Sequence, residues 1–71
     1  MFSLNERVKY NGRFLRRTQA DYETCAMRGT VVEIINRPPF PRVRVLWDGE
    51  QEPRTCDVRN LTPLKPGAPV P

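Results

Sequence analysis

The chain has 71 residues, with 12 Lys and Arg against 8 Asp and Glu and no histidine. This length is enough for one small domain with a single core, and too short for a two-lobed enzyme with an enclosed cleft. The lack of histidine excludes Ser-His-Asp and Cys-His nucleophiles and histidine-ligated zinc, and two cysteines are too few for a four-thiolate zinc site. We therefore expect a binding module, a subunit of an oligomer, or an enzyme that works without these groups.

The composition is that of a soluble globular domain, with 38% hydrophobic and 28% charged residues. No segment approaches the roughly 20 apolar residues of a membrane-spanning helix. The first ten residues lack a basic region followed by an apolar stretch, so no secretory signal is predicted. We expect a cytoplasmic protein in which Cys25 and Cys56 are free thiols, with a disulfide between them as the less favoured alternative.

The net charge of +4 is unevenly distributed along the chain. Residues 1–20 contain five basic residues and one acid, whereas residues 21–71 contain seven of each, so the whole excess belongs to the first 20 residues. Ten of the twelve basic residues are arginine, whose planar guanidinium suits phosphates, carboxylates and aromatic faces.

The elements expected in chain order are mostly short strands. Alternation of apolar and polar residues, or a β-branched run, predicts strands over 6–10, 28–36, 42–48 and 54–58, and a last short strand near 61–64. Prolines 38, 39 and 41 end the second strand, and Asp48-Gly49 predicts the hairpin after the third. Residues 65–71 (KPGAPVP) are expected to form an extended proline-rich tail.

The segment from 11 to 27 has no period of two. Asn11-Gly12 predicts a turn, and we expect a long structured loop to follow it. A short helix over 18–26, with Thr18 or Asp21 as its N-cap, is the alternative.

The expected core draws on every strand and is thin for a chain of this length. Its candidates are Val8, Tyr10, Val31 or Val32, Ile34, Val43, Val45, Trp47, Cys56, Val58 and Leu61. Assembly into a homo-oligomer or a larger complex would add stability to so small a core.

These segments together resemble a known class of small barrels. The string ERVKY … GTVVEI … PRVRVLWDG … DVRNLTPL is similar to SH3-like barrels of the Tudor, KOW and Mib-Herc type, with matches that include Gly29, Trp47, Asp48, Gly49 and Leu61. The resemblance implies an all-β, five-stranded SH3-like barrel over residues 6–64, preceded by a lead-in over 1–5 and followed by the tail over 65–71. The long arginine-rich first loop and the proline-rich connection over 37–41 depart from that pattern, in regions where such barrels usually bind their ligands.

The candidate binding residues are arginines with interleaved aromatics. Basic side chains next to aromatic rings are typical of surfaces that follow a nucleic-acid backbone. The predicted site consists of Arg13, Phe14, Arg16 and Arg17 in the first loop, Phe40 in the proline-rich connection, and Arg42 and Arg44 on the third strand. A second interpretation places Trp47 with Phe14, Tyr22 and Phe40 in an aromatic cage for a methylated cation, but its alternation with Val43 and Val45 favours the core.

The function expected from these features is a non-catalytic adaptor that contacts nucleic acid or an acidic protein surface, as a small bacterial or phage accessory protein would. No catalytic residue, metal ligand set, Gly-rich phosphate loop or cofactor is predicted. Two alternatives stay open. The length and the barrel also resemble type II dihydrofolate reductases, which are NADPH-dependent tetramers, although residues 54–58 (RTCDV) lack the Val-Gln-Ile-Tyr pore motif. A structural subunit that docks on a larger partner is the other alternative.

Overall fold

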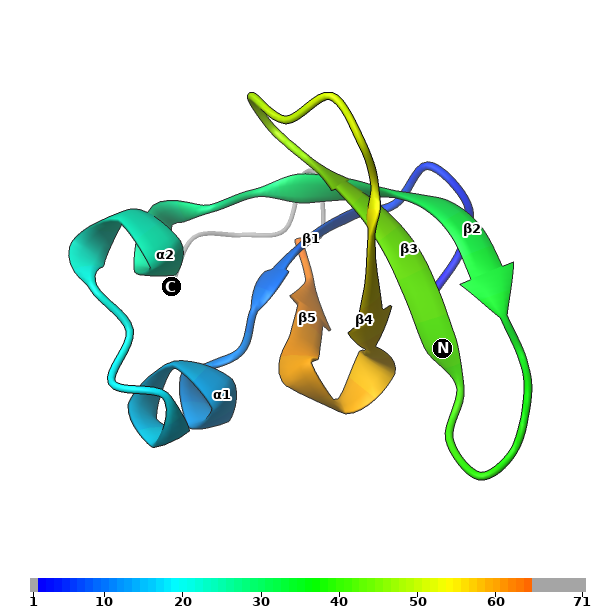
Figure 1. Cartoon of the computed structure of the whole chain (residues 1–71), viewed down its shortest axis with the longest axis horizontal. Helices are drawn as coiled ribbons and strands as arrows, with labels where there is room; N and C mark the ends of the chain where they lie inside the picture. The colour runs from blue at the N-terminus through cyan, green and yellow to red at the C-terminus, as the bar shows by residue number, and fades with distance from the viewer. Residues whose placement is uncertain (1, 65–71) are drawn as a thin grey trace.

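The fold is a five-stranded antiparallel sheet with two short helices, seen in a computed structural model that describes residues 2–64 (Figure 1). The expected tail over 65–71 lies outside the described residues. The elements are β1 (Arg7–Tyr10), α1 (Gly12–Arg17), α2 (Tyr22–Ala26), β2 (Gly29–Ile35), β3 (Arg42–Trp47), β4 (Arg54–Asp57), the 3₁₀ turn η1 (Val58–Asn60) and β5 (Leu61–Pro63). All five expected strands are confirmed. No helix in the described part of the chain is long and apolar enough to cross a membrane.

The strand order is β4-β3-β2-β1-β5, so β1 pairs with both β2 and β5. Strands β4 and β5 form the two edges of the sheet and are joined directly through η1. The lead-in is attached to the sheet, because the Asn5 amide donates to the Val31 carbonyl at 2.8 Å. The architecture is therefore a small sheet-rich domain with helices inserted between its first two strands.

The expectation of a long structured loop between the first two strands is wrong, because two helices occupy it. Asn11 begins α1 as its N-cap, with its side-chain oxygen accepting from the Phe14 amide at 2.8 Å. Asp21 caps α2 in the same way through the Thr24 amide at 2.9 Å, as the alternative prediction had it. Thr18 is the C-cap of α1 instead. Helices of six and five residues are too short to show a helical period in the sequence.

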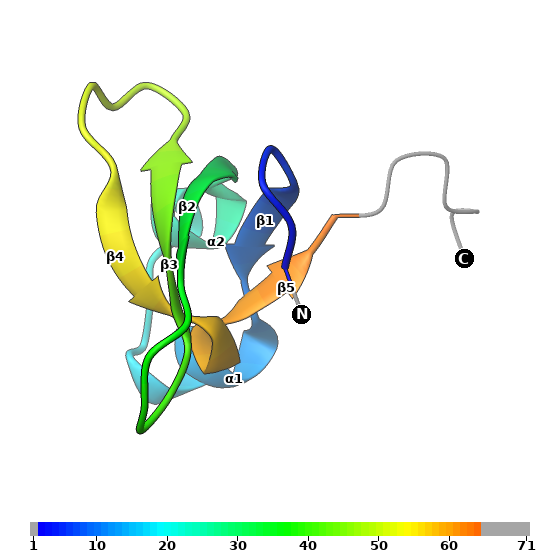
Figure 2. The same cartoon turned by 90° about the vertical axis from the view of Figure 1, so that its right-hand side faces the viewer.

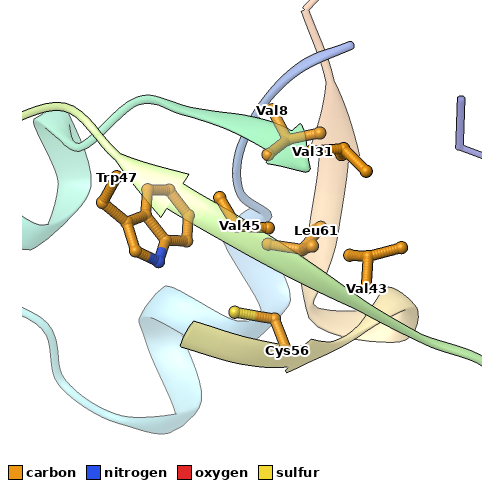
Figure 3. Packing of buried hydrophobic residues seen from close by; sticks show 7 residues of the cluster. All are labelled: Val8, Val31, Val43, Val45, Trp47, Cys56 and Leu61. Atoms are coloured by element: carbon orange, nitrogen blue, oxygen red, sulfur yellow. The ribbon is translucent and has the colours of Figure 1, made fainter. Parts of the chain in front are cut away.

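The core is built from inward-facing residues of all five strands (Figure 3). Its buried members are Val8, Val31, Val43, Val45, Trp47, Cys56 and Leu61, and each of them was among the candidates. Tyr10 and Val58 pack against this cluster but are only partly buried. Neither cysteine is paired, and burial raises the pKa of the Cys56 thiol, so Cys56 serves as a small apolar core residue.

A β-bulge in β2 explains why Val31 and Ile34 share one face of the sheet. Val31 pairs with Val45 and Glu33 with Arg44, which leaves Val32 as an extra residue without a partner on β3. After the bulge, Ile34 lies opposite the inward-facing Val43. Glu33 is thereby kept out of the core. The prediction that Ile34 is a core residue is wrong. Ile34 lies beyond the end of the core and is 37% exposed.

Gly29 is required by the close packing of β2 on β3. It lies directly opposite Trp47, and a Cβ atom there would be 2.5 Å from Val45 Cγ1 and 2.9 Å from Trp47 Cε3. Both neighbours are fully buried core side chains. No side chain larger than hydrogen fits between them without displacing the core.

We predict that Gly29→Ala lowers the free energy of unfolding by about 1–3 kcal/mol through overpacking, measured by urea denaturation. Gly12→Ala is the matched control, because a Cβ at Gly12 meets only the flexible end of Arg16, at 3.2 Å. That variant should be neutral or stabilising by up to about 1 kcal/mol, since alanine is the better helix former. Equal losses in the two variants would contradict the packing argument.

Candidate functional site

One end of the molecule gathers three segments that are far apart in the sequence. Helix α1, the turn η1 and the connection between β2 and β3 lie at the lower edge of the molecule in both Figure 1 and Figure 2. We call this region the basic end. With the adjoining ends of β3 (Arg42) and β4 (Asp57) included, its charged residues are Arg13, Arg16, Arg17, Arg37, Arg42, Arg59 and Asp57. Six arginines and one aspartate give it five net positive charges.

The rest of the described chain is slightly acidic. The β3–β4 connection, at the upper edge in Figure 1, contains Asp48, Glu50 and Glu52. Two of these acids are paired: Arg7 binds Asp48 at 2.5 Å and Arg54 binds Glu50 at 2.7 Å. Arg7 is one of the five basic residues among the first 20, but it is neutralised by Asp48 far from the basic end. Positive charge is thus concentrated at one end of the described chain, and arginines of β3 and η1 contribute to it as well as those of α1.

A hollow of about 260 Å³ lies between α1 and η1. Its lining residues are Arg13, Arg17, Asp57, Arg59 and Asn60. The two elements are held together by the Asn11 amide, which donates to the Asn60 carbonyl at 2.9 Å, and by the Asn11 side chain, which donates to the Arg59 carbonyl at 2.7 Å. The cap of α1 thus also fixes the position of η1. Arg17 donates to the Asn60 side-chain oxygen at 3.3 Å.

Arg59 is oriented by two partners. Its guanidinium donates to both carboxylate oxygens of Asp57, with a shortest distance of 2.8 Å, and it stacks 3.7 Å from the centre of the Phe40 ring. The Arg59 guanidinium lowers the pKa of Asp57, with the nearby Arg42 adding a smaller effect. A guanidinium held flat by an aromatic face and a carboxylate is pre-organised to present its free edge to an anion or a base.

A continuous stack of rings connects the core to α1. Tyr10 lies between Trp47, at 4.6 Å between ring centres, and Phe14, at 4.4 Å. Arg17 lies 5.9 Å from the Phe14 ring. Trp47 is fully buried and Tyr22 is 85% exposed on α2, so the aromatic-cage interpretation is wrong and the core interpretation of Trp47 is confirmed.

The structure brings most of the predicted site residues to the basic end. Arg13 and Arg17 line the hollow. Phe14 stacks on Tyr10, and Phe40 contacts Arg59, which also lines the hollow. Arg16 is exposed on α1, and Arg42 lies opposite Asp57 in the β3–β4 pair.

One predicted residue lies elsewhere, and four members of the region were not predicted. Arg44 lies opposite Glu33 and Thr55 on the outer face of the sheet, away from the hollow. The members that were not predicted are Arg37, Asp57, Arg59 and Asn60. Arg59 could have been identified from its position two residues after Asp57, because this spacing allows the two side chains to form an ion pair at the start of η1.

No protein-family model matches the chain, and no curated protein or solved structure is significantly similar to it.

We predict that Asp48 and Asp57 titrate below the ordinary aspartate value of 3.8 because each accepts hydrogen bonds from an arginine. Depressed folded-state pKa values mean that both groups stabilise the fold at neutral pH, and that this contribution is lost as the pH falls below 3.8 through the folded-state pKa values. Carboxyl NMR titration measures each group separately. Arg7→Gln should return only Asp48 toward its ordinary pKa, and Arg59→Gln only Asp57. If either substitution moved both carboxylates, the two pairs would not be independent.

Proposed function

We propose that this protein is a non-catalytic binding module whose basic end contacts the phosphate backbone of a nucleic acid. The observation that carries the proposal is that six arginines, from α1, the β2–β3 connection, the start of β3 and η1, lie at one end of the molecule (Figure 1). Five of them, all except Arg59, make no ion pair within residues 2–64. Arg13, Arg17 and Arg59 line one hollow, and Arg42 and Arg59 line a neighbouring groove. Like charges that share a lining repel one another, and an anionic ligand would relieve that repulsion.

We further propose that the sheet is an SH3-like barrel. The return of β5 to pair with β1 supports this, because it brings the last strand beside the first. The short η1 link between the two edge strands supports it as well. On such a scaffold the basic end consists of connections between strands, and binding residues are commonly carried by connections on a rigid sheet.

A nucleic acid fits the basic end better than an acidic protein surface does. The cations are all arginines, which bind phosphates and carboxylates alike through two parallel hydrogen bonds, so the choice between the two partners depends on the aromatic rings beside them. Of these rings, Phe40 is 45% exposed and Phe14 lies beside Arg17. A cationic surface with adjacent aromatic faces is typical of proteins that follow a nucleic-acid strand. With about five net charges in the region, binding is expected to be weak and strongly salt-dependent.

Arg13→Gln combined with Arg17→Gln should weaken binding of a labelled oligonucleotide of about ten nucleotides, a length within the usual site size. Removing two phosphate contacts should also reduce the slope of log affinity against log salt by about 2. Fluorescence anisotropy at about 50 and about 200 mM salt measures both effects.

The matched control for this double variant is Arg44→Gln combined with Arg54→Gln, which removes the same charge away from the basic end. Its affinity and salt slope should stay close to those of the unmodified protein. Equal losses in the two double variants would show that net charge alone drives binding. Binding only to acidic peptides, with no response to oligonucleotides, would overturn the proposal in favour of a protein partner.

Asp57→Asn should strengthen oligonucleotide binding by several-fold. The substitution removes the only acid of the basic end and releases Arg59 from its ion pair, while asparagine can still cap η1 through its side-chain oxygen. The same anisotropy titration measures the gain. Glu52→Gln, which removes one negative charge from the opposite connection, is the control and should change affinity little. Weaker binding by Asp57→Asn would instead show that Asp57 holds Arg59 in its binding position.

A further inference from the structure

An apolar groove of about 440 Å³ lies beside the basic end. Its apolar lining residues are Phe2, Ile34, Pro41, Val43, Val58 and Leu61, and its polar lining residues are Asn36, Arg42 and Arg59. These residues come from the lead-in, from the adjoining ends of β2 and β3 and the connection between them, and from η1 and β5. The groove therefore opens where the inner face of the sheet reaches the basic end.

The groove exists because apolar side chains continue past the end of the core. The bulge in β2 places Ile34 opposite the buried Val43, on the inner face, yet Ile34 remains 37% exposed. Val58 packs against the core but is only partly buried. Both residues have the character of core residues without being fully covered by the described part of the chain. Such an uncovered apolar surface on a small domain marks a place where another molecule packs.

The charge around the groove indicates what that molecule is. Arg42 makes no ion pair within residues 2–64, and Arg59 lines both this groove and the hollow beside α1. The groove and the hollow thus share a wall. An occupant that fits both has an apolar, flat part for the groove and an anionic part for the adjoining arginines.

A nucleotide of a single strand has this combination. Its phosphate is an anion that arginine binds well, and its base has apolar faces that pack on aliphatic and aromatic side chains. Phe40, stacked on Arg59 and 45% exposed, lies at the same boundary, and both a ring and a guanidinium plane can stack on a base. The Asn36 amide can hydrogen-bond a base edge. A duplex would present phosphates to the arginines while keeping its bases stacked and out of reach of the groove.

We infer that the basic end selects single-stranded over duplex nucleic acid, with one unstacked base held in the groove beside Arg42 and Arg59. The inference rests on the proposed function, because it names the kind of nucleic acid that the same arginines bind. It adds a second part to that site, in which the apolar groove, and not the charge, decides between the two forms.

The test compares the affinity of the full chain for a labelled single strand of about ten nucleotides, within the usual site size, with its affinity for a hairpin duplex with the same number of phosphates. The single strand should bind more tightly. Ile34→Asn and Phe40→Ala should each weaken single-strand binding by about tenfold, as loss of a stacking contact does, and leave duplex binding nearly unchanged. Val32→Asn is the matched control, since Val32 is a similarly exposed residue of β2 at 42% and does not line the groove.

A second measurement does not depend on the folding of any variant. A single strand containing 4-thiouridine, irradiated on the unmodified protein, should crosslink to the peptides that contain Ile34, Phe40 or Val58. Crosslinks confined to α1 would overturn the inference, as would equal affinity for strand and duplex. Concentration-dependent dimerisation of the unmodified chain that Ile34→Asn abolishes would assign the groove to a second copy and would also overturn it.

The two proposals fail in distinguishable ways. If Arg13→Gln with Arg17→Gln weakens binding of both forms while Ile34→Asn changes neither, the proposed function stands and the groove has no role in it. If no oligonucleotide binds at low salt, the proposed function fails, and the inference that rests on it fails too.

Discussion

The stack of Trp47, Tyr10 and Phe14 connects the interior of this protein to its surface. Trp47 is fully buried beside Gly29 and Val45, Tyr10 stacks on its ring, and Phe14 of α1 stacks on Tyr10. Each aromatic pair of this kind contributes about 0.5–1.5 kcal/mol beyond the burial of its area. Because α1 has no buried residue of its own, this stack and the Asn11 contacts to η1 hold its arginines in place. The position of the α1 arginines therefore depends on the packing of the core around Trp47.

Ion pairing divides the surface into two unlike ends. Arg7 with Asp48 and Arg54 with Glu50 neutralise one another near the β3–β4 connection. These exposed pairs contribute little to stability, yet they determine which arginines have no acidic partner within residues 2–64 and could bind an anion. At the basic end Asp57 alone balances six arginines, and its partner Arg59 is also held by Phe40. A net charge of +4 over the chain thus becomes a region of about five positive charges facing a slightly acidic remainder.

The strands and the core could be predicted from the sequence because alternation and β-branched runs encode them directly. Val8, Val43, Val45 and Trp47 follow a period of two, and all are buried. The two helices could not be predicted in this way, since each is shorter than two turns and begins at a cap, Asn11 or Asp21, that also suits a turn. The site was predicted only in part. Arg13, Arg17 and Phe40 were identified from local composition, whereas Arg59 joins them through tertiary contacts with Phe40 and with the hollow. The bulge at Val32 could not be predicted from the sequence either, because it is defined by the pairing of β2 with β3.

The small size of the core and the presence of the groove have the same origin. Seven buried residues close the inner face of the sheet around Trp47, but in the row formed by Ile34, Val43 and Cys56 the first member, Ile34, stays partly exposed. Covering Ile34 and Val58 with a longer connection would add stability, yet it would remove the apolar surface beside Arg42 and Arg59. Like-charge repulsion among the arginines of the basic end is a second cost, and the proposed ligand, an anion with an apolar part, would relieve both. A ligand that binds only the folded chain raises its stability in proportion to the logarithm of its concentration. The proposed ligand would therefore stabilise the region in which partly exposed apolar side chains lie beside arginines.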